Sequence, residues 1–252
     1  MLLTSPVGEL EYLIAGSGTP VTVLAHGLGG SIAQTRPLAG GVPGTRAFLH
    51  FPGHGASVHP AQPPTIAELA SALDAVAGEV AATRAVGVSL GATALLHLLA
   101  GRPDRFERVV FFLPAAVDRV RSAASRAILS EMAAAIDAGT VEDVVRKEIP
   151  VAVRDTRAAR EYVRDRAAAL AGLAPTVRAA AAEVAVTDRA ALARVRVPAL
   201  VIGAVGDPLH EAAVARELAA TLPRARLHVF DEPGPLWTRR AELRALIGGF
   251  LS

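Results

Sequence analysis

The chain has 252 residues, 52% of them hydrophobic, which is enough to build the buried core of one large α/β domain. Its net charge is only +2, with basic and acidic residues interspersed along stretches such as 154–166, so we expect no nucleic-acid partner. The absence of cysteine excludes disulfides, thiolate metal sites and a cysteine nucleophile.

Short apolar runs alternate with helical patterns along the chain, in the order expected of parallel βαβ units. Most of these runs are β-branched or aromatic and end in Gly, Pro or Asp, as buried parallel strands do. The predicted strands cover 10–15, 21–25, 46–51, 85–88, 108–113, 199–203 and 226–230. The predicted helices between and after them cover 65–81, 91–100, 211–221 and 239–251. Thr65, with Glu68 three residues later, predicts a capping box at the start of the first helix.

Residues 114–196 interrupt this alternation because they contain no convincing strand. Four helices are predicted there, at 122–139, 141–147, 156–170 and 175–183. We therefore predict a doubly wound, mostly parallel α/β core formed by residues 1–113 and 197–252. Residues 114–196 would form an α-helical cap over the carboxyl ends of the strands, where ligands bind in such sheets.

The pentapeptide Gly87-Val88-Ser89-Leu90-Gly91 lies between a predicted strand and a predicted helix. In that context the glycines allow a tight turn, and the serine is held in an exposed, strained backbone position. The pattern predicts Ser89 as a nucleophile. The alternative is that the motif is kept only for its turn geometry.

Two further blocks precede this elbow and one follows it. His26-Gly27-Leu28-Gly29-Gly30 follows the strand at 21–25, and Pro52-Gly53-His54-Gly55 follows the strand at 46–51. Gly206-Asp207-Pro208-Leu209 comes after the apolar run that ends at Gly203. In this order and spacing the blocks resemble the α/β-hydrolase superfamily, in particular its small esterase, haloperoxidase and C–C hydrolase branch. The resemblance covers the whole chain apart from residues 114–196, which would be the variable cap.

The resemblance implies a role for each matching position. Ser89 would be the nucleophile and Asp207 the acid that orients the base, although an Asp-Pro pair also occurs simply as a turn initiator or helix cap. The backbone N–H groups of Leu28 and Leu90 would form the oxyanion hole, and their side chains would line an apolar pocket. His26 and Gly27 would contribute to the substrate pocket. An alternative for His26, as for His54, is that it organises its glycine-rich loop through hydrogen bonds.

The chain departs from the family where the catalytic histidine is expected. After the last predicted strand it has Gly234-Pro235, and proline has no side-chain group that can take a proton. A serine hydroxyl needs such a base at neutral pH. Among the seven histidines, His210 is the candidate for a displaced base because it lies three residues after Asp207, although it could also be a partly exposed residue at a helix start. Trp237, close by, could offer a flat surface to an apolar ligand or anchor the last helix in the core.

These features predict a serine-hydrolase-like enzyme that acts on an ester or another carbonyl compound through an atypical or incomplete triad. The alternative is a non-hydrolytic protein that reuses the pocket, either to bind an apolar small molecule or as a lyase or cyclase. No cofactor or metal is expected, because no helical His-x-x-x-His pair and no phosphate-binding loop occurs. No apolar run reaches the roughly 18 residues of a membrane span, and the amino-terminal residues do not resemble a signal peptide, so we expect a cytoplasmic protein without a membrane partner. The sequence carries no signal for an oligomeric state.

Overall fold

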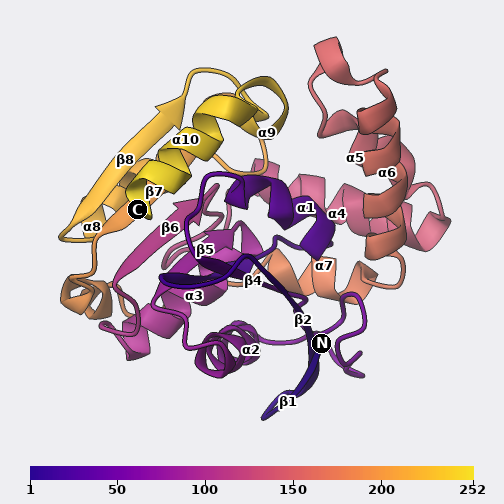
Figure 1. Ribbon diagram of the computed structural model, residues 1–252. Helices are drawn as coiled ribbons and strands as arrows, with labels where there is room; N and C mark the ends of the chain where they lie inside the picture. Colours follow the sequence, from indigo (N-terminus) through magenta and orange to yellow (C-terminus); the bar gives the residue numbers. More distant parts are fainter.

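The computed structural model describes residues 1–252 and contains one eight-stranded sheet with helices on both faces (Figure 1). The strands are β1 (Leu2–Ser5), β2 (Gly8–Ala15), β3 (Val21–Ala25), β4 (Thr45–Leu49), β5 (Arg84–Val88), β6 (Arg108–Phe112), β7 (Ala199–Ala204) and β8 (Ala225–Phe230). Their order is β1-β2-β4-β3-β5-β6-β7-β8. The pairings from β4 through β8 are parallel, whereas β1 pairs with β2 and β2 with β4 in antiparallel fashion. The predicted doubly wound, mostly parallel sheet is confirmed.

The prediction missed β1, and the reason is its place at the edge of the sheet. This strand has four residues, pairs only with β2, and buries none of its side chains fully. It therefore lacks the continuous apolar run by which a buried strand is found in a sequence.

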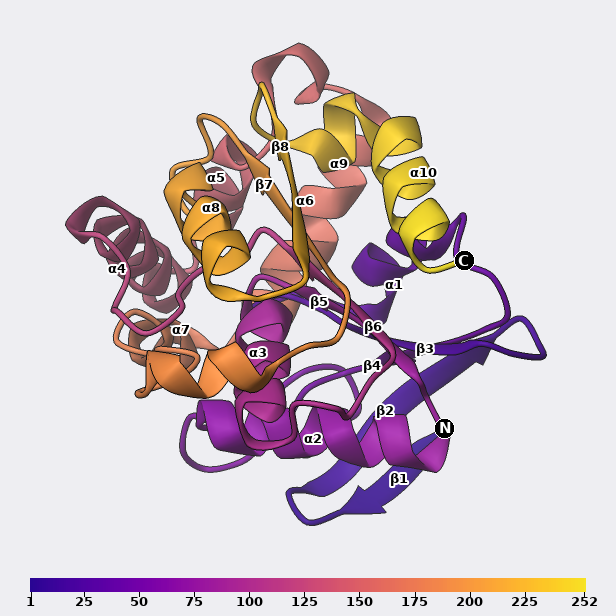
Figure 2. The same ribbon diagram turned by 90° about the vertical axis from the view of Figure 1, so that its left-hand side faces the viewer.

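Helices cover both faces of the sheet. They are α1 (Ile32–Thr35), α2 (Ile66–Glu79), α3 (Leu90–Gly101), α8 (Ala212–Thr221), α9 (Pro235–Thr238) and α10 (Arg240–Phe250). One face packs against α2, α3 and α8, and the other against α1 and α10 (Figure 2). The predicted capping box of α2 is present: the Thr65 side chain accepts from the Glu68 amide, and the Glu68 carboxylate accepts from the Thr65 amide. None of the helices combines the length and the hydrophobicity that crossing a bilayer requires.

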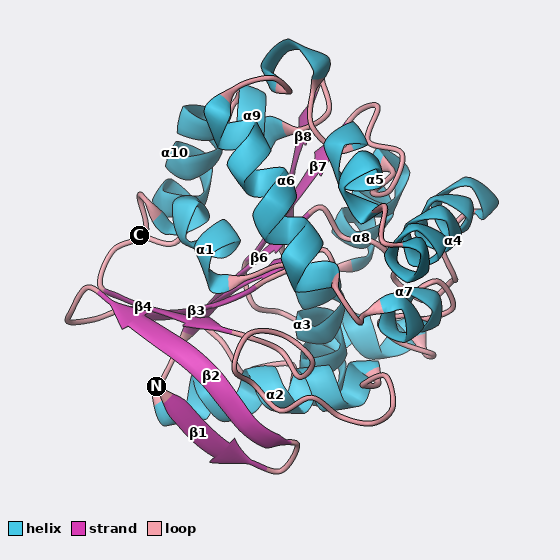
Figure 3. Cartoon of the chain, turned by 90° about the vertical axis from the view of Figure 1, so that its right-hand side faces the viewer, coloured by secondary structure: helices cyan, strands magenta, loops and turns pink.

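Between β6 and β7 the chain forms a helical insertion, a name we use for residues 114–196. It contains α4 (Ala123–Ala138), α5 (Val141–Lys147), α6 (Arg157–Leu170) and α7 (Ala174–Ala180), and no strand. Ser122 caps α4 and Thr156 caps α6, each accepting a hydrogen bond from the amide three residues later. Figure 3 shows α6 between α1 and α5. The helical insertion thus lies close to the loops that leave the carboxyl ends of the strands.

Candidate active site

Ser89 lies in a strained turn between β5 and α3. Its φ of 48° and ψ of −107° fall where a non-glycine residue is rarely found, at a cost of about 1–3 kcal/mol. A Cβ on Gly87 would lie 2.5 Å from the Gly91 carbonyl oxygen, and one on Gly91 would lie 2.6 Å from the Ala25 carbonyl oxygen. Both positions therefore require glycine. The turn places the Ser89 side chain at the carboxyl end of the central strands.

The turn after β7 brings a carboxylate and an imidazole to this serine. His210 Nε2 lies 2.8 Å from Ser89 Oγ, and His210 Nδ1 lies 3.2 Å from Asp207 Oδ2. The side chains of His210 and Asp207 are 13% and 15% exposed, so the pair is shielded from most solvent. Three side chains thus form one continuous hydrogen-bonded chain, although the carboxylate and the imidazole are only three residues apart in the sequence.

The hydrogen-bond partners define the tautomer of His210. An ionised carboxylate only accepts, so Nδ1 carries the proton that is donated to Asp207. Nε2 is then free to accept from the Ser89 hydroxyl, which is the arrangement a general base requires. Burial by itself would raise the pKa of the Asp207 carboxyl, but His210 and the hydrogen bonds from the Leu209 and His210 amides together hold it below its usual value.

Asp207 also shapes the turn that carries His210. Its Oδ1 accepts from the backbone amides of Leu209 and His210, both at 2.9 Å, while Oδ2 faces the imidazole. The same carboxylate therefore organises the local backbone and orients the ring. The turn-forming role considered from the sequence and the ring-orienting role coexist in one side chain.

Two backbone amides next to Ser89 have no partner in the protein. Neither the N–H of Leu28 nor that of Leu90 donates a hydrogen bond, although both residues are buried. Gly27 packs directly against Ser89, since a Cβ there would lie 3.3 Å from Ser89 Cβ. Free amides on both sides of a serine are suited to receive a carbonyl oxygen on which charge develops.

The loop that carries Leu28 is held by buried histidines. His26 Nδ1 contacts the Gly27 carbonyl oxygen at 2.7 Å, and its Nε2 accepts from the Phe51 amide. His54 Nε2 accepts from the Gly29 amide at 3.0 Å. Burial lowers the pKa of His26 well below its usual value and that of His54 to about 4, so both rings are neutral acceptors at neutral pH.

The prediction that His26 contributes to the substrate pocket is corrected by these contacts. The residue is only 1% exposed, and both of its ring nitrogens are engaged by the main chain. The loop-organising alternative describes its contacts. His50 acts similarly at the far end of the loop, where its Nε2 accepts from the Ile32 amide and its Nδ1 contacts Glu11 at 2.7 Å.

The helical insertion also contacts this loop. Arg166 on α6 donates from Nη1 to the Leu28 carbonyl oxygen at 2.9 Å. The same guanidinium forms a two-pronged ion pair with Glu148, with distances of 2.7 and 3.0 Å. The loop that carries Leu28 is therefore supported from the sheet by histidines and from the helical insertion by an arginine.

The segment after β8, where the family would place its histidine, packs against the helical insertion instead. Pro235 is buried in the first turn of α9, and Gly234, at φ 70°, lies against the Pro150 ring. The half-buried Trp237 ring meets Tyr162 of α6 edge to face, with ring centroids 5.2 Å apart. Of the two roles considered for Trp237, the structure shows an aromatic packing contact, made with α6.

The other histidines do not approach Ser89 through hydrogen bonds. His97 contacts the Ala185 carbonyl oxygen, His59 the Gly55 carbonyl oxygen, and His228 lies 3.8 Å from a Glu242 carboxylate oxygen. His210 alone supplies imidazole to the elbow.

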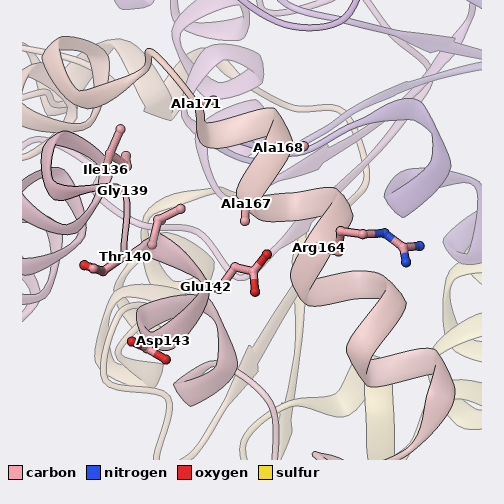
Figure 4. Close-up of a pocket in the computed structure, with 10 residues that line it drawn as sticks. Ile136, Gly139, Thr140, Glu142, Asp143, Arg164, Ala167, Ala168 and Ala171 are labelled. Carbon is pink, nitrogen blue, oxygen red and sulfur yellow. The ribbon is translucent and has the colours of Figure 1, made fainter.

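One surface hollow lies elsewhere, within the helical insertion. It has a volume of about 580 Å³ between α4, α5 and α6, and its wall includes Glu142, Arg164 and Ala167 (Figure 4). None of the three hydrogen-bonded side chains at the elbow borders it. A second hollow of about 320 Å³ borders the turn that carries His210, through Leu209 and Glu211.

Neither a protein-family model nor a curated protein sequence matches the chain. Solved structures do share its fold over nearly the whole length. A hydrolase from Pseudomonas aeruginosa PA01 is 25% identical with a TM-score of 0.80, covering 100% of this chain and 98% of its own. The enol-lactonase from Burkholderia xenovorans LB400 is 25% identical with a TM-score of 0.73, covering 100% and 99%. An α/β-hydrolase enzyme from a Medee basin deep-sea metagenome library is 17% identical with a TM-score of 0.83, covering 99% and 96%.

The sheet, the strained serine turn and these likenesses together define the class of protein. The chain has the α/β-hydrolase fold.

Proposed function

We propose that this protein is a serine hydrolase that cleaves an ester or a related acyl bond in a small, largely apolar molecule. Ser89 is the nucleophile, His210 the general base and Asp207 the group that orients it. The observation that carries the proposal is the unbroken hydrogen-bonded chain from Asp207 through His210 to Ser89. A triad is defined by such geometry and not by the order of its members along the chain.

The geometry supports a two-stage acyl transfer. Ser89 Oγ attacks the substrate carbonyl carbon while His210 Nε2 takes the hydroxyl proton, and the carbonyl oxygen becomes an oxyanion that the Leu28 and Leu90 amides stabilise. The tetrahedral intermediate collapses, the bond to the leaving group breaks, and His210 returns the proton to the leaving alcohol. Water then attacks the acyl-enzyme, again losing its proton to His210, and the acid product leaves as Ser89 is restored.

The lining of the site favours an uncharged acyl group. The residues that carry the two free amides are leucines, and both are buried. The ion pair nearest to the loop, Arg166 with Glu148, is closed on itself and leaves no free charge for a substrate. One structural neighbour is an enol-lactonase, which adds cyclic esters to the compounds that should be tried.

A fluorophosphonate probe tests the proposal, because it reacts only with a serine that has been activated by a base. We expect wild-type protein to be labelled at Ser89 and the Ser89→Ala variant to be unlabelled. Ser17→Ala, which removes an exposed serine in a loop, is the matched control and should label like wild type. Hydrolysis of short-chain p-nitrophenyl esters should follow the same pattern. Absence of labelling under conditions that label an ordinary esterase would overturn the proposal and favour a binding protein or a lyase.

A further inference from the structure

Arg121 is a buried arginine that donates a hydrogen bond to a backbone carbonyl and forms no ion pair with a carboxylate. It lies just before α4 in the helical insertion, is 8% exposed and makes no ion pair within 4.0 Å. Its Nη1 donates to the Leu209 carbonyl oxygen at 3.1 Å. Ser125 Oγ donates to the same oxygen at 3.2 Å. Two side chains of the helical insertion therefore converge on one carbonyl of the turn after β7.

That carbonyl belongs to the peptide group that leads into His210. The N–H of the same peptide group is held by Asp207 Oδ1 at 2.9 Å. The peptide is therefore fixed on both sides, by Asp207 at its N–H and by Arg121 with Ser125 at its C=O. A peptide plane that is held on both edges cannot rotate freely, so the direction in which His210 leaves the backbone is defined.

This support matters because one short turn carries both the carboxylate and the imidazole. Any rotation of the turn moves both groups together relative to Ser89. Errors of about 1 Å in the position of a catalytic group can lower a rate about 10²-fold. The turn contains Pro208, and the side-chain hydrogen bonds to its backbone come from Asp207 itself and from Arg121 and Ser125 of the helical insertion.

The charges around Arg121 fit a supporting role better than an anion-binding role. Burial lowers the pKa of Arg121 to about 10, while the charge of Asp207 acts in the opposite direction. The cavity of about 320 Å³ beside Arg121 is lined by Glu211 and Glu217 as well as by Arg119, which pairs with Glu217, so it offers no excess of positive charge to an anion. Ser122 Oγ donates to the Glu211 carboxylate, which adds a further link between the helical insertion and this turn.

We propose that Arg121, assisted by Ser125, is a positioning residue that holds the Asp207–His210 turn in register with Ser89. The proposal rests on the proposed hydrolase function and deepens it, because it gives Arg121 and Ser125 of the helical insertion a part in positioning the catalytic groups. It predicts that kcat depends on Arg121, whereas substrate affinity does not.

The test compares four variants for kcat, KM and the rate of fluorophosphonate labelling. Arg121→Met should lower kcat and the labelling rate about 10²-fold with KM within about twofold of wild type, because a misplaced base slows both reactions. Arg121→Lys keeps a charge and a donor and should restore part of the loss. Ser125→Ala removes the second donor and should lower kcat a few-fold. Arg119→Met is the matched control: Arg119 is exposed, pairs with Glu217 and does not contact the turn, so its kcat should equal that of wild type.

Crystal structures of the same variants separate this proposal from the hydrolase function. In Arg121→Met the distance from His210 Nε2 to Ser89 Oγ should exceed the 2.8 Å of the wild-type protein, whether or not the protein is active. A wild-type kcat in folded Arg121→Met, or an unchanged His210 position in its structure, would overturn the positioning role. Labelling of the wild-type protein at Ser89 would in that case still support the hydrolase function. Unlabelled wild-type protein with a displaced His210 in Arg121→Met would instead refute the hydrolase and support the positioning role.

Discussion

The turns that follow the last two strands of the sheet have opposite characters. After β7, residues 205–211 include Asp207 and His210, which hydrogen-bond to each other, and His210 also reaches Ser89. After β8, residues 231–239 contain the short helix α9, in which Pro235 is buried and the half-buried Trp237 meets Tyr162 of the helical insertion. The turn after β7 thus makes the hydrogen bonds expected of a catalytic centre, whereas the turn after β8 makes packing contacts.

The topology explains how these tasks can be divided in this way. Strands β7 and β8 are neighbours and parallel, so the loops after both strands emerge at the same edge of the sheet. An imidazole on either loop can therefore approach the elbow after β5. Because His210 already lies beside Ser89, no histidine is needed on the loop after β8. That loop instead carries Trp237, which packs against Tyr162.

The largest expected effect comes from His210, in the turn after β7. His210→Ala should lower kcat/KM for an activated ester by at least about 10³-fold, because the Ser89 hydroxyl loses its proton acceptor. His228→Ala is the control, since that histidine lies on β8 next to Glu242 and should change kcat/KM little. Steady-state kinetics on both variants decide the matter. Comparable losses of kcat/KM in the two variants would mean that catalysis does not depend specifically on the turn after β7.

A smaller effect is expected from Trp237, the aromatic of the turn after β8. Trp237→Ala removes the edge-to-face contact with Tyr162 and should lower the free energy of unfolding by about 1–2 kcal/mol, which corresponds to a few degrees in Tm. The kcat should change much less than in His210→Ala. Tyr162→Phe keeps the ring pair and serves as the control in thermal denaturation. A loss of kcat without a loss of Tm in Trp237→Ala would place the turn after β8 in the catalytic centre.

The smallest effect is expected from returning a histidine to the position that the family uses. Pro235→His should not raise kcat/KM by more than about twofold, because Pro235 is buried in the first turn of α9 and the hydroxyl of Ser89 already has its acceptor. The sharper form of the experiment puts Pro235→His into the His210→Ala background. Recovery of ester hydrolysis there would show that the two loops are interchangeable in this protein.

Several elements could be predicted because their signals are local. The elbow glycines, the capping box of α2 and the apolar runs of β3, β5 and β7 each express a backbone or burial requirement within a few residues. The helices of residues 114–196 were expected at nearly their observed positions for the same reason. The edge strand β1 and the short helix α9 were missed, since a four-residue element has too few positions to show a period.

The contacts within the site could not be predicted, because they depend on distances between residues that are far apart in the sequence. The sequence identified Asp207 and His210 as neighbours, and it left His210 open between a displaced base and a partly exposed residue at a helix start. It carried no signal for Arg121, whose partner, the Leu209 carbonyl, is a backbone group that every residue possesses. Similarly, nothing in the pattern linked Arg166 to the Leu28 carbonyl, because the two residues are 138 positions apart.

The sequence by itself determined the class of fold, the strained serine and the absence of a histidine at position 235, since each of these is a property of adjacent residues. Only the tertiary structure decided that His210 faces Ser89, that Trp237 packs on Tyr162, and that the helical insertion holds both loops of the site. The reason is physical. A side chain acquires a hydrogen-bonding role when the folded sheet brings another group within about 3 Å of it, and that proximity is set by packing across the whole chain.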